Sequence, residues 1–235
     1  MVLSSKPKTP KTSLNITVND TQGNPSQVEE VTSFKYLGVW IDKHLSWDFH
    51  IEKLCNKISQ RLGVLNRCRK FITKDTALLL YNALTQPLFD YADIVWQTCK
   101  KEHIVRLERL QKRGARIILQ CGVQDLSSTD LLNRLKWLPI SKRLELHTVT
   151  MVYKCLNDLA PQYLSDLFTQ TDQVHNYNTR HSDRLYPNLN KKEFKNRSFS
   201  TVGTNLWNKL PKTVRDAPSL ASFKSRYLMQ QQSIQ

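Results

Sequence analysis

The sequence lacks the short motifs that identify most enzyme classes. It contains no G-x-S-x-G nucleophile elbow, no phosphate-binding P-loop and no dinucleotide fingerprint, so hydrolase and nucleotide-binding interpretations have no support. The histidines also show no H-x-x-x-H or H-E-x-x-H spacing; they are His44, His50, His103, His147, His175 and His181. We expect His50, which opens a predicted helix, to pack or to make a local hydrogen bond rather than to act as an acid or base.

Paired cysteines and long apolar runs are missing as well. No C-x-x-C pair occurs, which argues against a zinc ribbon or knuckle; the cysteines are Cys55, Cys68, Cys99, Cys121 and Cys155. Most of them fall at apolar helical positions, which predicts reduced, buried thiols and a reducing compartment. No signal peptide or membrane-length apolar run is visible. We therefore predict an intracellular protein of the cytoplasm and/or nucleus, not secreted and without a membrane partner.

Acidic residues are scarce. The 235 residues include 20 Asp and Glu against 35 Lys and Arg, a formal net charge of +15. The excess leans toward the C-terminal end, where residues 171–235 hold 11 Lys and Arg against 4 Asp and Glu. Such a balance points to a polyanionic partner, with nucleic acid ranked before an anionic membrane surface. The length allows one sizeable core or two small domains.

The N-terminal part has the pattern of a β-hairpin. Leu14, Ile16 and Val18 alternate with polar residues, Asn19 to Pro25 reads as a turn, and residues 28–42 are rich in aromatic and β-branched side chains. We therefore predict one hairpin over residues 14–42. Gly38 inside the second strand suggests a bulge or a close approach of another backbone.

From Ser46 onward the apolar period becomes helical. One stripe comprises Ile51, Leu54, Cys55, Ile58, Leu62 and Leu65. Further helices are predicted over 75–85, 102–119, a short stretch opened by Ser127, and 141–157 with Ser141 as the cap. Residues 162–200 read as loop with short elements, and 206–211 and 219–229 as two short helices. The fold class is thus mainly α with a small N-terminal β-hairpin and a less regular, basic C-terminal region.

The helix predicted over 102–119 carries a row of arginines. Arg106, Arg109, Arg113 and Arg116 occupy an arc of roughly 80° at about 100° per residue, beside an apolar arc. Such a row could hold a nucleic-acid backbone without reading its sequence. A solvated basic face partly neutralised by Glu102 and Glu108 remains the alternative. Aromatic residues interleaved with basic ones, as in Lys35-Tyr36, 177–181 and 195–199, could stack on unpaired bases, but for each stretch taken singly buried aromatics beside solvated charges are the more frequent explanation.

A segment from Phe34 to Asp42, followed by His44-Leu45-Ser46-Trp47 and His50-Ile51, resembles the reverse transcriptases of non-LTR (LINE-type) retrotransposons, most closely the jockey/CR1-type elements. In that family an F-K-Y-L-G-V strand and D-x-x-L-x-W-x-x-H-I follow the catalytic palm, form the primer grip and lead into the helical thumb. The resemblance continues through residues 78–84, 87–91, 107–111, 153–157 and 206–211.

The resemblance implies three parts: the end of the palm with the primer-grip hairpin (1–45), a helical thumb-like domain (46–160) and a basic C-terminal region (161–235). Its primer-grip-like residues would be Phe34, Lys35, Tyr36, Leu37 and Gly38. The implied partner is an RNA–DNA or DNA duplex, bound without sequence specificity. The parent polymerase would use Mg²⁺, but we expect no cofactor and no metal ligand in this chain.

Catalytic aspartates are not expected here. Tyr91-Ala92-Asp93 resembles the aromatic-Ala-Asp-Asp motif of polymerases, but Ile94 stands where the second carboxylate is needed, and the tripeptide follows the primer grip instead of preceding it. Met1 is expected to be an internal methionine of a longer reading frame, and the chain alone is expected not to polymerise DNA. The alternatives are a non-catalytic helical protein-interaction module (a domesticated fragment) and an unstable remnant.

Overall fold

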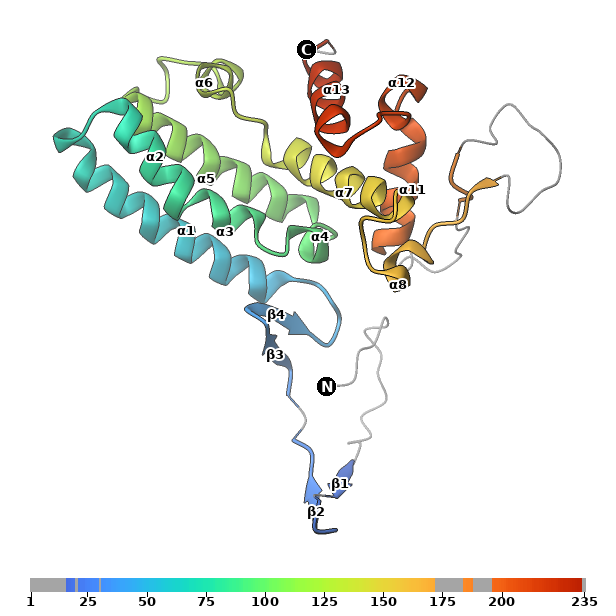
Figure 1. Ribbon diagram of the computed structural model, residues 1–235. Coiled ribbons are helices and arrows are strands. Elements are labelled where there is room, and N and C mark those ends of the chain that lie inside the picture. Colours follow the sequence, from blue (N-terminus) through green and yellow to red (C-terminus); the bar gives the residue numbers. More distant parts are fainter. Residues whose placement is uncertain (1–15, 20, 30, 172–183, 188–195, 234–235) are drawn as a thin grey trace. The chain divides into compact units, whose positions relative to one another are not determined.

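The computed structural model describes residues 16–19, 21–29, 31–171, 184–187 and 196–233 (Figure 1). It divides into two compact units. Unit 1 comprises Met1–Leu88 and Cys99–Leu110, and unit 2 comprises Phe89–Thr98 and Gln111–Gln235. Helices predominate in both units, and strands occur near the N-terminus, which confirms the predicted fold class.

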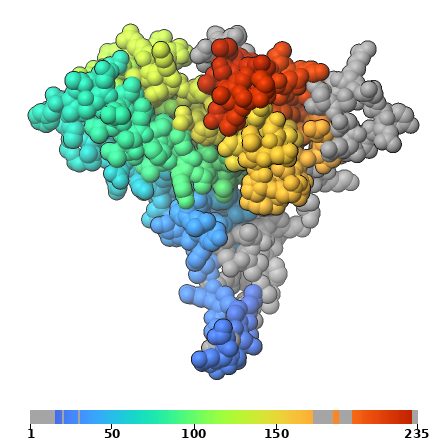
Figure 2. All heavy atoms as spheres, viewed as in Figure 1, coloured from blue at the N-terminus to red at the C-terminus, as the bar shows by residue number. Residues whose placement is uncertain are grey.

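Two short hairpins replace the single predicted one. β1 (Thr17–Asn19) pairs with β2 (Pro25–Gln27), and β3 (Ser33–Tyr36) pairs with β4 (Val39–Asp42), both antiparallel. Every residue of β1 and β2 is exposed, and Figure 2 shows their deep-blue atoms open to solvent on the visible face. The prediction of one continuous strand over residues 28–42 was wrong because the chain reverses at Leu37 and Gly38.

Unit 1 is organised around α1 (Asp48–Cys68), the 3₁₀ turn η1 (Arg69–Phe71) and α2 (Lys74–Leu84), with the start of α5 (Lys101–Leu119). Its core confirms the predicted stripe, because all six residues on it are buried. Ala77 and Tyr81 of α2 and Leu107 of α5 are fully buried too. The α2 helix is capped by Thr73, whose Oγ1 accepts a hydrogen bond from the Thr76 N–H at 3.2 Å.

The chain passes from unit 1 to unit 2 within α3 (Gln86–Asp90), whose second residue is Pro87. Unit 2 then contains α4 (Asp93–Trp96), α6 (Ser128–Leu135) and α7 (Ile140–Leu156). The predicted cap at Ser127 is confirmed, because its Oγ accepts from the Asp130 N–H at 3.1 Å. The predicted cap at Ser141 was wrong, since α7 already begins after Pro139, whose fixed φ suits a helix start.

The C-terminal part of unit 2 packs onto α7. It consists of α8 (Gln162–Ser165), α11 (Phe199–Lys209), α12 (Lys212–Arg215) and α13 (Leu220–Ser233). The two predicted short helices thus exist, although α11 begins earlier than expected. The stretch 177–181 singled out in the sequence lies outside the described residues, as does Lys195. The rest of the stretch 195–199 is described, and it ends in the partly buried Phe199, the first residue of α11.

The core of this part explains the Leu206–Pro211 segment. Trp207 stacks on Phe223 at 5.8 Å, and Phe223 also packs against Tyr153 of α7 at 4.7 Å between ring centroids. The Tyr153 hydroxyl donates to the Ala217 carbonyl at 2.8 Å. Asn208 pairs with the backbone of Leu185 in both directions, as a strand would, at 2.8 and 2.9 Å. The sequence did not predict this core, because the spacing of apolar residues gives no information about hydrogen bonds between distant residues.

The five thiols are unpaired with one another, but the expectation that most are buried was wrong. Cys55 and Cys155 are buried, Cys99 and Cys121 are partly buried, and Cys68 is exposed. Burial raises the pKa of the Cys99 thiol to about 12, so it stays protonated. None of the helices within the described residues combines the length and the apolarity that spanning a bilayer requires.

Gly203 of α11 lies close against α7. A Cβ atom built there would lie 2.8 Å from Cγ2 of the fully buried Val152. We expect Gly203→Ala to destabilise the chain by about 1–3 kcal/mol through overpacking, measured by urea unfolding followed by circular dichroism. Gly63→Ala is the matched control, because nothing lies within 4 Å of its Cβ position. That substitution should stabilise α1 by about 0.5–1 kcal/mol; equal effects at both sites would contradict the close packing of α11 on α7.

Candidate nucleic-acid interface

The β3–β4 hairpin presents the residues predicted to form a primer grip. Phe34, Tyr36 and Leu37 are 54%, 59% and 74% exposed, and Lys35 and Gly38 are exposed too. Val39 on the partner strand is buried, and the Trp40 ring meets Phe49 of α1 edge to face at 4.9 Å. The hairpin is therefore anchored through β4 and leaves β3 and the turn open to solvent.

The turn itself is a two-residue reversal. Leu37 and Gly38 both have positive φ, 45° and 86°, between the paired residues Tyr36 and Val39. Positive φ at both central positions is typical of a type I′ turn, whose twist matches that of a hairpin. Gly38 thus serves the turn, and the bulge predicted for it is not present. Leucine rarely adopts this conformation, so placing Leu37 in the turn costs a small amount of conformational free energy.

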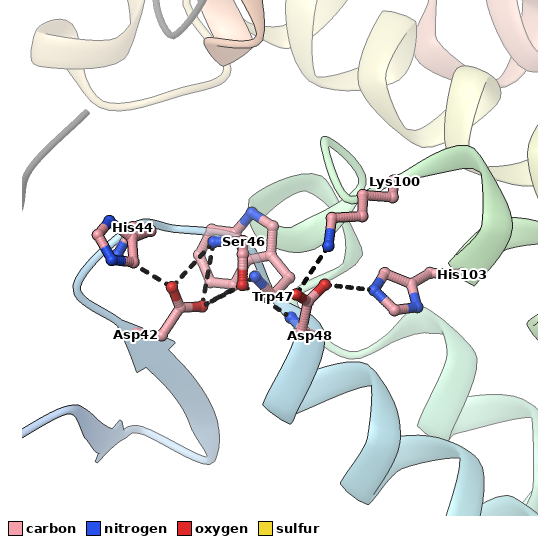
Figure 3. Close-up of polar contacts among 7 residues, drawn as sticks. All are labelled: Asp42, His44, Ser46, Trp47, Asp48, Lys100 and His103. Atoms are coloured by element: carbon pink, nitrogen blue, oxygen red, sulfur yellow. Dashed lines mark hydrogen bonds and ion pairs between the residues drawn. The ribbon is translucent and has the colours of Figure 1, made fainter. Parts of the chain in front are cut away.

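Asp42 joins the hairpin to α1 (Figure 3). Its carboxylate accepts hydrogen bonds from the backbone N–H groups of His44 at 3.0 Å, Ser46 at 3.0 Å and Trp47 at 2.9 Å, and from the Ser46 hydroxyl at 3.1 Å. Trp47 is the N-terminal flanking residue of α1 and has no side-chain cap of its own. The Asp42 carboxylate therefore satisfies the N–H of the flanking residue Trp47 and of the loop before it, while the first helical N–H, that of Asp48, donates to Ser46 Oγ at 3.3 Å.

The same contacts set the ionisation of Asp42. Burial raises its pKa, but the hydrogen bonds from Ser46, Trp47 and His44 outweigh that effect and leave the pKa below the ordinary 3.8. The carboxylate is thus charged at neutral pH and placed where a negative charge favours the start of a helix.

His50 adds a second tie between the hairpin and α1. Its Nδ1 accepts the Trp40 N–H at 3.4 Å, and burial lowers the pKa of the ring. An imidazole that accepts through Nδ1 must be neutral, which agrees with this shift. The expected packing or hydrogen-bonding role of His50 is confirmed.

Asp48, in the first turn of α1, links this helix to the start of α5. Its Oδ2 lies 2.8 Å from Lys100 Nζ and its Oδ1 lies 2.6 Å from His103 Nε2 (Figure 3). Burial raises the pKa of Asp48, but the hydrogen bonds from His103 and Lys100 outweigh it and lower the pKa. The hairpin, α1 and the beginning of α5 are therefore held together by two carboxylates.

The arginine row is present on α5. Arg106, Arg109 and Arg113 are exposed, while Leu107, Ala115 and Ile118 of the same helix are buried. Arg116 is partly buried, and its buried Nε has no hydrogen-bond partner among the described residues. Arg106 and Arg109 belong to unit 1 and the other two to unit 2, so the row is a property of one continuous helix.

Asp93 is buried and paired with another side chain of unit 2. It is 4% exposed, opens α4 after Ala92 in the left-handed conformation, and pairs with Nδ1 of His147 on α7. The neighbouring Asp90 binds Arg143 through both oxygens at 2.6 and 2.7 Å. Potential ligand atoms of Asp90, Asp93 and His147 lie within 4.8 Å of one another, but the bidentate arginine already occupies both oxygens of Asp90.

Sequence reasoning did not identify Asp42 and Asp48 as key residues. Asp42 binds N–H groups whose positions depend on how the following loop folds. Asp48 binds Lys100 and His103, which lie far away in the sequence. The only available signal was Asp42 itself, which appears in the family pattern D-x-x-L-x-W-x-x-H-I. The structure gives that pattern a physical meaning: it is the joint between the hairpin and α1.

Comparisons with known proteins point in the direction of the sequence resemblance. The chain is 27% identical over 106 residues to the probable RNA-directed DNA polymerase from transposon X-element of Drosophila melanogaster. It is 24% identical over 162 residues to the probable RNA-directed DNA polymerase from transposon BS of the same organism. These matches cover 41% and 67% of this chain, but only 12% and 14% of the polymerases.

A third relative is the uncharacterized protein B0403.1 of Caenorhabditis elegans, 31% identical over 97 residues, which are 41% of this chain and 49% of that protein. The chain is distantly related to transposon RNA-directed DNA polymerases. No protein-family model and no solved structure matches it. The matched region spans about half or less of each relative.

Removal of the Asp42 carboxylate tests how much its hydrogen bonds stabilise the connection between the hairpin and α1. We expect Asp42→Ala to lower the unfolding free energy at pH 7 by about 1–2 kcal/mol, because the N–H groups before α1 would be left without their acceptor. Glu52→Ala, which removes the same charge from an exposed position on α1, should change it by less than about 0.5 kcal/mol.

The pH dependence of that loss has a definite sign. The native pKa of Asp42 lies below 3.8, so its contribution is complete above about pH 4 and fades as the pH falls through the native pKa. The difference between the wild type and Asp42→Ala should therefore shrink in urea titrations at low pH. A difference that stays constant down to the acid transition would contradict the assigned hydrogen bonds.

Proposed function

We propose that this chain binds nucleic-acid duplexes through their phosphate backbones, in the role of the primer grip and thumb of a jockey/CR1-like non-LTR reverse transcriptase. The observation that carries the proposal is the exposed arginine row on α5, in a chain with a net charge of +15 that is distantly related to transposon polymerases. The proposal assigns the chain binding and not polymerisation.

The α5 helix supports this role by separating its two faces. Its apolar residues are buried, while three guanidinium groups extend into solvent about one helical turn apart. Guanidinium groups bind phosphates through paired hydrogen bonds, and such contacts position a duplex without selecting a sequence. The RNA–DNA hybrid and the DNA duplex are both suitable ligands under this proposal.

The β3–β4 hairpin supports a second contact. In the sequence, Lys35 stands between Phe34 and Tyr36, and all three residues are exposed. The hairpin is tied to α1 by Asp42 and His50. An exposed apolar turn on a rigid support suits close contact with a sugar–phosphate backbone. We assign the contact with the primer strand to Phe34, Lys35, Tyr36, Leu37 and Gly38. The Mg²⁺ of such a polymerase would be bound by parts of the parent protein other than these residues.

Protein binding is the second candidate, and one observation favours it. Leu159, Tyr163 and Leu167 are exposed at four-residue intervals in and around α8 of unit 2. A helical interaction module would use such apolar residues and would bind its partner with little dependence on salt. Salt dependence therefore separates the two candidates.

The arginine row is tested by its effect on the salt slope. We expect Arg109→Ala with Arg113→Ala to weaken binding to an RNA–DNA duplex, because two guanidinium groups no longer neutralise phosphates. The slope of log K against log salt should become shallower by about 0.9 for each phosphate left without its cation. The measurement is fluorescence anisotropy with a labelled duplex between about 50 and 200 mM salt.

The control removes the same charge elsewhere. Arg134 of α6 and Lys212 of α12 are both exposed, so Arg134→Ala with Lys212→Ala lowers the net charge equally. This double variant should keep the wild-type slope. Equal slopes for both double variants would refute the assignment of the α5 face, and a wild-type chain without salt-sensitive affinity would refute the function.

A further inference from the structure

The end of α1 and the α1–α2 connection form a segment without negative charge. Residues 53–74 contain seven Lys and Arg and not one Asp or Glu. Six of these cations are exposed: Lys53, Lys57, Arg61, Arg67, Lys70 and Lys74. The exposed cations continue along α1 and around the connection. This connection is coloured teal and lies at the far left of Figure 1. No acidic neighbour within this segment neutralises them, so the surface suits a polyanion.

Phe71 lies in the middle of the connection and is 79% exposed, the highest value for a large apolar side chain among the described residues. Its ring contacts the Lys70 ammonium group, which lies 4.8 Å from the ring centroid. An exposed Phe71 contributes less to the stability of the fold than a buried one would, since burying a phenylalanine side chain stabilises by about 1.5–3 kcal/mol.

The backbone on both sides of Phe71 is fixed. Arg69 is buried despite its charge, and its Nη1 donates to the Ile72 carbonyl at 2.8 Å across the connection. Thr73 then caps α2 through the Thr76 N–H. The exposure of Phe71 is therefore set by the ordered η1 turn and not by a chain end or a long loop.

Taking the proposed function as its basis, we propose that Phe71 stacks on an unpaired base of the bound nucleic acid while Arg67, Lys70 and Lys74 hold the adjoining phosphates. Stacking of an aromatic side chain on a base contributes about 1–3 kcal/mol and does not depend on the base identity. The flanking cations supply the backbone contacts that single-strand-binding surfaces combine with such rings.

A nucleic acid fits this surface better than a membrane does. One phenylalanine is a small apolar anchor, and a basic patch generally requires a second strong membrane signal for stable attachment. The surface also lies apart from the hairpin, because the 21 residues of α1 separate β4 from η1 by about 30 Å. The two surfaces can therefore be altered independently.

The test compares a blunt RNA–DNA duplex with the same duplex carrying a single-stranded extension. We expect Phe71→Ala to weaken binding of the extended duplex about five- to hundredfold and to leave the blunt duplex almost unaffected. The salt slope should not change, since no charge is removed. Phe71→Trp should retain binding, whereas Phe71→Leu, which is apolar but has no ring, should lose it.

Leu79→Ala is the matched control, because Leu79 is 67% exposed on α2 of the same unit. It should bind both duplexes as the wild type does, and Phe71→Ala should unfold at the wild-type temperature. Equal binding of the extended duplex by Phe71→Ala and the wild type would overturn this inference alone. Equal binding by Phe71→Leu and the wild type would also overturn it. A wild-type chain that binds neither duplex would refute the proposed function itself.

Discussion

The carboxylate of Asp42 makes the contacts on which the arrangement of unit 1 depends. Between β4 and α1 the chain bends through Leu45 and Trp47, both with positive φ, at 50° and 64°. Such angles are unfavourable for residues with side chains and persist only where the surroundings fix them. Asp42 fixes them by accepting hydrogen bonds from the N–H groups of this bend. This bend sets the direction of the hairpin relative to α1, the residue at which α1 begins and the position of Asp48.

The few acidic residues matter for the surface charge because several of them are bound inside the fold. Asp42, Asp48, Asp90 and Asp93 each engage backbone or side-chain partners inside their own unit. Acidic groups bound internally do not neutralise the exposed cations of α1 and α5. A chain with few acids, several of them committed to structure, leaves positive charge for a partner. This distribution explains why binding is the function best supported for this chain.

Periodicity predicted the helices well because burial on one face is a local property of the sequence. The α1 stripe and the arginine row on α5 were both recognisable from spacing alone. The turn at Leu37-Gly38 was not recognised, because leucine at positive φ is unusual in a type I′ turn. The pairs Asp93–His147 and Asp90–Arg143 join residues more than fifty positions apart, so no spacing rule could predict them. The partners of Asp42 were not predicted for another reason: they are backbone N–H groups of the following loop, and their positions depend on the positive φ angles of Leu45 and Trp47.

The central claim is that the exposed cations of the β3–β4 hairpin, α1 and α5 contact a nucleic acid, and chemical protection of lysines tests it most directly. Acetylation of each lysine can be followed by mass spectrometry with and without an RNA–DNA duplex that carries a single-stranded extension. The account predicts slower modification of Lys35 on the hairpin and of Lys57 and Lys70 on and after α1. Unchanged modification of all three lysines in the presence of bound duplex would contradict it.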